Sequence, residues 1–171
     1  FSANSIGDEG TAALSDALKT NSTLETLELR SNKVGAAGAQ SLAGMLQVNR
    51  ALNSLDLCNN NLGEASETIA QAVLQHPTME VFCNIPMKKM REDSLTELDL
   101  SRKRIGAHGA MVIAPLLEFS RSLTSVNFTQ ACFPCVLVYP GKFSVCVAFH
   151  PVDSTQASRL TAQAVQGAAR E

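Results

Sequence analysis

Apolar residues return at a fixed interval along the chain. Residues 24–29 have the form L-x-x-L-x-L, and apolar segments of the same kind begin at Leu52, Leu95 and Leu123. Within each segment the last apolar positions alternate with polar ones, which is typical of a short strand with one buried face. We therefore predict strands centred on Leu27, Leu55, Leu98 and Val126.

A different pattern fills the space between these segments. In residues 36–47 the apolar side chains recur three and four positions apart, as in an amphipathic helix. The same spacing predicts helices over residues 7–19, 65–75 and 107–118. Between strand and helix stands N-x-[ILV]-G-x-x-G, in which the asparagine can satisfy backbone groups and the first glycine permits a sharp entry into the helix.

Both patterns share a period of 28 residues. Asn4, Asn32 and Asn60 follow it, and the glycines three residues after each of them follow it as well. Neither the strand nor the helix of such a unit can bury its apolar face alone, whereas stacked units bury it continuously. The sequence therefore predicts an α/β solenoid with parallel strands on the inner curve and helices outside.

The motif L-x-x-L-x-L-x-x-N-x-[IVL]-G-x-x-G at this period resembles the ribonuclease-inhibitor type of leucine-rich repeat. Repeats of that type also form the sensor arrays of NOD-like receptors and the body of Ran GTPase-activating protein. The resemblance covers residues 1–128 and implies a horseshoe arc with concave strands and convex helices. It also implies a scaffold that binds a protein partner and is not an enzyme. The alternatives are regulation of a small GTPase and the ligand-sensing part of a NOD-like receptor.

The repeat pattern is interrupted over residues 79–94. Residues 79–85 predict a short strand that arrives one residue early, and too few residues remain before Leu95 for a full unit. The charged run over 88–93 is interpreted as a solvent-facing connector, with a binding loop or a change of curvature as the alternative. In the next unit Lys103 replaces the repeated asparagine, and we expect the basic turn around it to be frayed.

The pattern changes again at the ends of the chain. Residues 129–171 are a non-repeat tail, in which a hairpin about Pro140 and Gly141 and a helix over 158–169 are one interpretation. Such a tail either caps the array or is poorly ordered. Phe1 aligns with Leu29, the last position of a strand segment, so we expect the chain to be part of a longer array.

Composition narrows the choice of partner. The 171 residues carry 14 basic and 16 acidic side chains, a net charge of −2. This balance argues against nucleic acid and membrane surfaces, which select a basic excess. No nucleotide-binding or catalytic motif is present, so we expect no small-molecule substrate. An odd number of cysteines, five, favours reduced thiols and a cytoplasmic location.

Metal-ligating residues gather in the tail. Cys132, Cys135, Cys146 and His150 have the spacings C-x2-C and then C-x3-H, which could supply four ligands for tetrahedral zinc. Their apolar surroundings instead favour ordinary buried cysteines, and we predict no metal and no cofactor. His108 stands at a helix start, where we expect it to be exposed.

The predicted binding surface follows from the alternation of strand side chains. The residue between the last two apolar positions of each segment points away from the helices, as does the residue two places later. These outward positions are Glu28, Arg30, Asp56, Cys58, Asp99, Ser101 and Asn127. Like positions stack in columns about 4.8 Å apart, so one column carries three carboxylates. Such a column of carboxylates favours a basic protein partner. The alternative is that these side chains only keep an exposed sheet face soluble.

Overall fold

The computed structural model describes residues 4–129 and the backbone of residues 144–146. The strands are β1 (Thr26–Glu28), β2 (Ser54–Asp56), β3 (Val81–Phe82), β4 (Glu97–Asp99), β5 (Ser125–Asn127) and β6 (Ser144–Cys146). The helices are α1 (Gly7–Thr20), α2 (Ala36–Val48), α3 (Ser66–Gln75), α4 (Met87–Arg91) and α5 (Gly106–Phe119), with a 3-10 turn η1 (Gly63–Ala65) before α3. The four predicted strand centres and the four predicted helices are confirmed.

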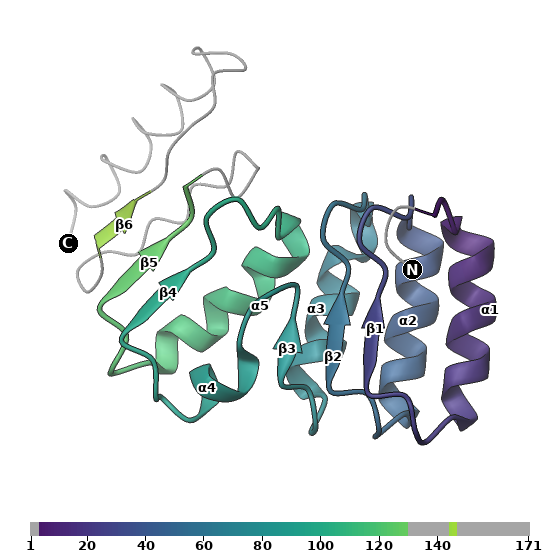
Figure 1. The fold of residues 1–171 in the computed structure, drawn as a ribbon, viewed down its shortest axis with the longest axis horizontal. Helices are drawn as coiled ribbons and strands as arrows, with labels where there is room; N and C mark the ends of the chain where they lie inside the picture. Colours follow the sequence, from purple (N-terminus) through teal and green to yellow (C-terminus); the bar gives the residue numbers. More distant parts are fainter. Residues whose placement is uncertain (1–3, 130–143, 147–171) are drawn as a thin grey trace, which may run out of the picture.

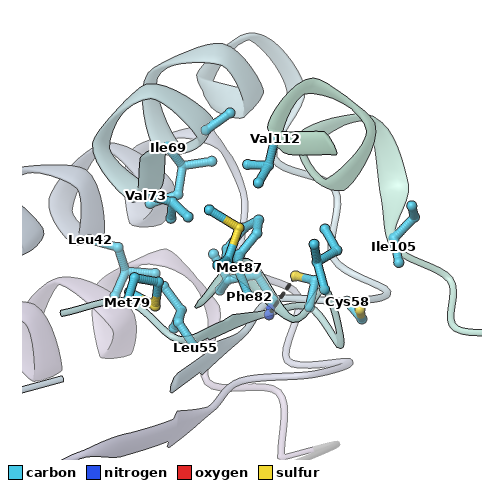
Figure 2. Packing of buried hydrophobic residues seen from close by; sticks show 14 of the residues in the cluster. Leu42, Leu55, Cys58, Ile69, Val73, Met79, Phe82, Met87, Ile105 and Val112 are labelled. Atoms are coloured by element: carbon cyan, nitrogen blue, oxygen red, sulfur yellow. Dashed lines mark hydrogen bonds between the residues drawn. The ribbon is translucent and has the colours of Figure 1, made fainter. Parts of the chain in front are cut away.

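Strands and helices form two layers, with the core between them (Figure 1). In the first sheet β1 pairs with β2 and β2 with β3, all parallel, so that Leu27, Leu55 and Phe82 lie in one row. Each of these side chains is at most 2% exposed. Figure 2 shows Leu55 and Phe82 packed with the helix residues Leu42 and Ile69. The 28-residue period thus places like residues in like positions of successive units.

The repeated asparagines join consecutive units. Asn60 Oδ1 accepts hydrogen bonds from the backbone N–H groups of Asn32 and Val34, at 2.9 and 3.0 Å. Its Nδ2 donates to the carbonyl oxygens of Leu29 and Leu57, at 2.8 and 2.9 Å. Asn32 repeats the acceptor role one unit earlier, toward the N–H of Asn4 at 2.9 Å. The predicted satisfaction of turn backbone groups by these side chains is confirmed, and it acts between units as well as within one.

β3 ends in a two-residue turn. Cys83 and Asn84 both have positive φ, 48° and 65°, and the flanking Phe82 and Ile85 exchange two backbone hydrogen bonds of 3.0 and 2.7 Å. Two consecutive residues of positive φ are the signature of a type I′ turn, which reverses the chain. The strand is therefore much shorter than the one predicted over residues 79–85.

The sheet stops at this turn. β1, β2 and β3 form one three-stranded sheet, and β4, β5 and β6 form another. Within the described ranges no ladder joins β3 to β4, whereas the helix layer continues, because α3 packs directly on α5. Figure 1 shows the strands of the second sheet inclined to those of the first. The shortened repeat thus interrupts the strand layer only.

The charged run after β3 begins as a short helix, which corrects the interpretation as a connector, although its charged side chains from Lys88 to Glu92 face solvent as predicted. α4 buries Met87 and Met90 in the core and exposes its two lysines. Arg91 donates to the carbonyl oxygen of Leu74, at the end of α3, and to that of Met79, shortly before β3, at 3.0 and 2.9 Å. The run is part of the packed structure.

Little of the tail falls within the described residues. β6 pairs with β5 in parallel, Val126 opposite Val145, so this segment extends the second sheet. Residues 144–146, in the second half of the predicted hairpin about Pro140 and Gly141, thus pair in parallel with β5. The first half of that hairpin and the predicted helix over 158–169 lie outside the described residues. No helix in the described ranges combines the length and the apolar character that crossing a membrane requires.

Candidate partner-binding face

The strand face is the layer of strand side chains that points away from the helices. Each strand from β1 to β5 alternates an accessible residue with a buried one. The strand face comprises Thr26, Glu28, Ser54, Asp56 and Val81 in the first sheet and Glu97, Asp99, Ser125 and Asn127 in the second. Four of these side chains are carboxylates and none is basic. The predicted outward orientation is therefore confirmed for Glu28, Asp56, Asp99 and Asn127.

The predicted column of three carboxylates is wrong. Glu28 lies opposite Asp56 in the first sheet, and Asp99 lies opposite Asn127 in the second. The rung beside Asp56 is filled by Cys83, because Leu55 pairs with Phe82. The turn after β3 thus separates the acidic side chains into two groups, one on each sheet.

Three of the outward side chains also bond to their own backbone. The Oδ1 atoms of Asp56, Asp99 and Asn127 accept the N–H of the residue two places later, at 2.8, 2.8 and 2.9 Å. The bond from Ser101 lowers the pKa of Asp99, because it favours the charged form. These side chains therefore shape the turn after each strand.

Cys58 was predicted to face outward, and this prediction is wrong. Its side chain is 0% exposed, while Arg30, at the same repeat position, is partly exposed. The difference comes from the turn after β3, where Asn84 Nδ2 donates to Cys58 Sγ at 3.7 Å. The backbone N–H of Asn59 also donates to the carbonyl of Arg104, at 3.4 Å. Cys58 is covered by segments that follow no 28-residue spacing.

The basic turn of residues 101–104 is anchored, which corrects the expectation of a frayed turn. Arg30 Nη2 donates to the carbonyl oxygen of Lys103 at 2.5 Å, across 73 positions of sequence. The Lys103 N–H donates to Leu100, and the Arg102 N–H to Thr129. Four basic side chains thus line one edge of the strand face, next to its acidic centre: Arg30, Arg102, Lys103 and Arg104.

A buried group of donor atoms, which no sequence motif indicates, lies beneath this edge. The carboxylate of Asp56 and the thiols of Cys58 and Cys83 each place one donor atom within 4.8 Å of the other two. Burial, and then the hydrogen bond with Cys58, raises the pKa of Cys83 well above its usual range. The sequence gives no signal for this group, because Cys83 reaches the rung of Asp56 only through the early strand.

His108 is buried, not exposed as predicted. Its side chain is 2% exposed and packs edge-on against Phe82, with ring centroids 5.9 Å apart. Burial lowers the pKa of His108 to about 4, since a charged imidazole would lose its hydration. Because the sheet stops at β3, the start of α5 packs over the end of the first sheet.

One open hollow lies at the other end of the strands, next to α4. It measures about 500 Å³ and is lined by Glu25, Arg50, Glu80, Lys88 and Arg91, among others. Glu80 and Lys88 pair with each other at 2.9 Å, and both remain half exposed. The hollow offers no set of convergent unpaired groups, so we assign no ligand to it.

The zinc ligands considered in the tail cannot be compared with the structure. Cys132, Cys135 and His150 lie outside the described residues, and only the backbone of Cys146 is described.

Residues 20–43 match the family model of the leucine-rich repeat. The matched segment runs from the end of α1 through β1 into α2, which is one strand-to-helix unit of the fold. No curated protein matches the sequence. Residues 20–43 are thus similar to a leucine-rich repeat, and the parallel strands and the asparagines that join successive units continue the same arrangement along the chain.

Proposed function

We propose that the chain is a scaffold whose strand face binds a basic segment of a partner protein. Leucine-rich repeats generally mediate protein–protein interaction. The observation that carries the proposal is the charge of the strand face: its residues in β1 to β5 include four carboxylates and no basic side chain. Complementary charge across such a face gives specificity and speeds association.

The arrangement of charges also suggests how a partner would be oriented. The acidic strand residues are bordered by the basic edge of Arg30, Arg102, Lys103 and Arg104, which would repel a basic segment. A basic segment would therefore run across the strands, away from that edge. Polar neighbours such as Thr26, Ser54 and Ser125 offer hydroxyl groups for additional hydrogen bonds.

The finer features of the proposal follow the resemblance. They are repeats of the ribonuclease-inhibitor type arranged in a horseshoe arc, with the strand face concave. We assign the scaffold no catalytic role, no cofactor and no nucleic-acid or membrane partner, and we place it in the cytoplasm. Two buried free thiols, Cys58 and Cys83, are consistent with a reducing compartment.

The experiment compares two sets of charge substitutions. The strand-face variant carries Glu28→Gln, Glu97→Gln and Asp99→Asn, which remove three negative charges. The amide oxygen of Asn at position 99 can still accept the hydrogen bond from the Ser101 N–H. The control carries Glu9→Gln, Glu64→Gln and Glu118→Gln, which remove three exposed charges elsewhere. Asp56 is left unchanged because it lies against the buried thiols.

The readout is fluorescence anisotropy with a labelled peptide of nine lysines at low and high salt. We expect the strand-face variant to bind about tenfold more weakly, about 1.4 kcal/mol, and the control to bind like the wild type. Binding of the wild type should weaken as salt rises. Equal affinities for the two variants would reject the strand face as the binding surface.

A further inference from the structure

We propose that Asp56, Cys58 and Cys83 bind a divalent metal ion of the zinc class, with the imidazole of His108 as the fourth ligand. The site lies where the strand layer is interrupted. It does not depend on the proposed binding of a basic partner.

The backbone brings the three donors together from two neighbouring units. Asp56 ends β2, and the pairing of Leu55 with Phe82 places Cys83 on the adjacent rung. Cys58 follows Asp56 by two residues and is held close by the bond from its N–H to the Asp56 carboxylate, at 2.8 Å. One donor atom of each residue therefore lies within 4.8 Å of the other two.

These distances suit a tetrahedral ion. With zinc–sulfur bonds of about 2.3 Å, two ligating sulfurs stand about 3.8 Å apart. The donor atoms thus need to approach one another by about 1 Å at most. Two thiolates and a carboxylate form a ligand set of the kind that zinc takes in proteins. Asp56 retains a second oxygen, to which no described residue donates a hydrogen bond.

Each sulfur accepts one N–H donor, although burial raises the pKa of the Cys83 thiol, so that metal binding would displace its proton. The backbone N–H of Leu57 donates to Cys83 Sγ at 3.3 Å, and Asn84 Nδ2 donates to Cys58 Sγ at 3.7 Å. Such donors stabilise metal-bound sulfur and fix its direction. Both thiols are 0% exposed, whereas Asp56 is partly exposed. The carboxylate therefore lies on the solvent side, where an ion would enter, and Figure 2 shows Cys58 inside the core cluster.

His108 provides an independent sign of a missing partner. Its Nε2 is buried and has no hydrogen-bond partner among the described residues, although burying a polar atom unpaired is costly. The ring packs against Phe82, the residue immediately before Cys83. Gly106 leaves it room, since a side chain there would stand 2.7 Å from the ring. Its nitrogens lie more than 4.8 Å from at least one of the three donors, so the ring would move toward them when it serves as the fourth ligand.

Two alternative roles for the cysteines predict different behaviour. Cysteines that merely fill the core would bind no Co²⁺, whatever the charge of the carboxylate beside them. A disulfide would join the same two sulfurs without needing Asp56 or His108. The dependence of metal binding on all four residues separates a metal site from both of these roles.

The test uses the full chain, purified free of metal in a phosphine reductant and titrated with Co²⁺ as the spectroscopic probe. We expect one equivalent to bind with a thiolate-to-cobalt absorption band and the visible bands of a tetrahedral ion, and Zn²⁺ to displace it. Cys58→Ser/Cys83→Ser should abolish the thiolate band. The matched control, Cys132→Ser/Cys135→Ser/Cys146→Ser, should retain it.

Two single variants keep the test valid if the double cysteine variant does not fold. Asp56→Asn keeps an oxygen for the Cys58 N–H, and we expect it to bind Co²⁺ at least tenfold more weakly. His108→Gln should weaken binding to a similar extent and change the visible bands. Absence of a thiolate band in the wild type, or its loss only in the tail control, would overturn the site. If His108→Gln binds Co²⁺ as the wild type does, His108 is not the fourth ligand of the site.

Discussion

The carboxylate of Asp8 lies at the N-terminus of the following unit's helix, where Oδ1 accepts the backbone N–H of Gly35 at 2.6 Å. The same oxygen accepts the N–H of Gly38 at 3.0 Å. The helix α2 has no cap from its own N-terminal residue, so its cap comes from the unit before it. An acidic side chain at this end is favoured by the helix dipole as well.

Replacing Asp8 should therefore destabilise the contact between the first two units. We expect Asp8→Ala to lower the free energy of unfolding by about 1–2 kcal/mol, as for the loss of a charged helix cap. Asp8→Asn, which keeps an acceptor, should cost less. Urea unfolding measures both, and Glu9→Ala is the control, because Glu9 is exposed. A loss in Glu9→Ala as large as that in Asp8→Ala would contradict the capping role.

Asn60 should be among the most sensitive polar positions. Asn60→Ala leaves two backbone N–H groups and two carbonyl groups without their partner. We expect a loss of about 2–4 kcal/mol, since each buried group left unpaired costs about 1–3 kcal/mol and water can reach part of the site. The neighbour Asn61 is exposed, and Asn61→Ala should change the midpoint of urea unfolding little. Similar midpoints for the two variants would argue against the role of Asn60 between units.

Arg91 should matter although it belongs to a charged run. Its guanidinium bonds to carbonyl groups of two preceding segments, at Met79 and Leu74. Lysine cannot reproduce the fork of donors, so Arg91→Lys should lower the melting temperature by a few degrees, corresponding to about 1 kcal/mol. Lys89 is exposed, and Lys89→Ala provides the control. If Arg91→Lys melts like the wild type, the bonds to these carbonyls do not stabilise the fold.

Asp93 should make stability depend on pH in the acid range. Its Oδ1 accepts the N–H groups of Arg121 and Ser122 at 2.9 and 3.1 Å, and the hydroxyl groups of Ser120 and Ser122 at 2.9 Å. These bonds lower the pKa of Asp93 to about 2 from an ordinary 3.8, and the bond from the Ser122 N–H contributes most. The charged form thus stabilises the folded state above pH 4, and this stabilisation is lost as the pH falls toward 2.

The comparison of wild type with Asp93→Asn tests this assignment. The wild type should be the more stable at pH 7, and the difference should shrink between pH 4 and 2 in urea unfolding. Asp16→Asn is the control, because Asp16 pairs only with Lys19 at the surface. A difference between wild type and Asp93→Asn that is constant with pH would show that the titration of Asp93 is not linked to folding.

The elements and the joining asparagines were predictable because the sequence repeats. Leu27 and Leu55, or Asn32 and Asn60, occupy the same position of the period, and stacking then fixes their register. Cys58 and His108 could not be placed in this way, because their neighbours belong to the shortened unit. The turn that ends β3 was not visible either, since Cys83-Asn84 lacks the glycine that usually marks a type I′ turn.

The binding face was predicted in part for the same reason. Alternation along a strand places Glu28 and Asp99 correctly, because it needs only local geometry. Whether two such residues belong to one column depends on the pairing of strands that are far apart in sequence. The bond between Arg30 and Lys103 likewise depends on that pairing, and the local pattern gives no sign of it.

The interruption between β3 and β4 also weakens the coupling between the two sheets. A regular repeat array unfolds as one unit because each repeat is stabilised by its neighbours. Here the hydrogen-bonded ladder stops at Phe82 and resumes at Glu97, so helix packing and a few loop contacts carry the coupling. We therefore expect the second sheet to open while the first stays intact, so that the amide protons of Leu29 and Leu100, both bonded across their own sheet, exchange with solvent through separate events.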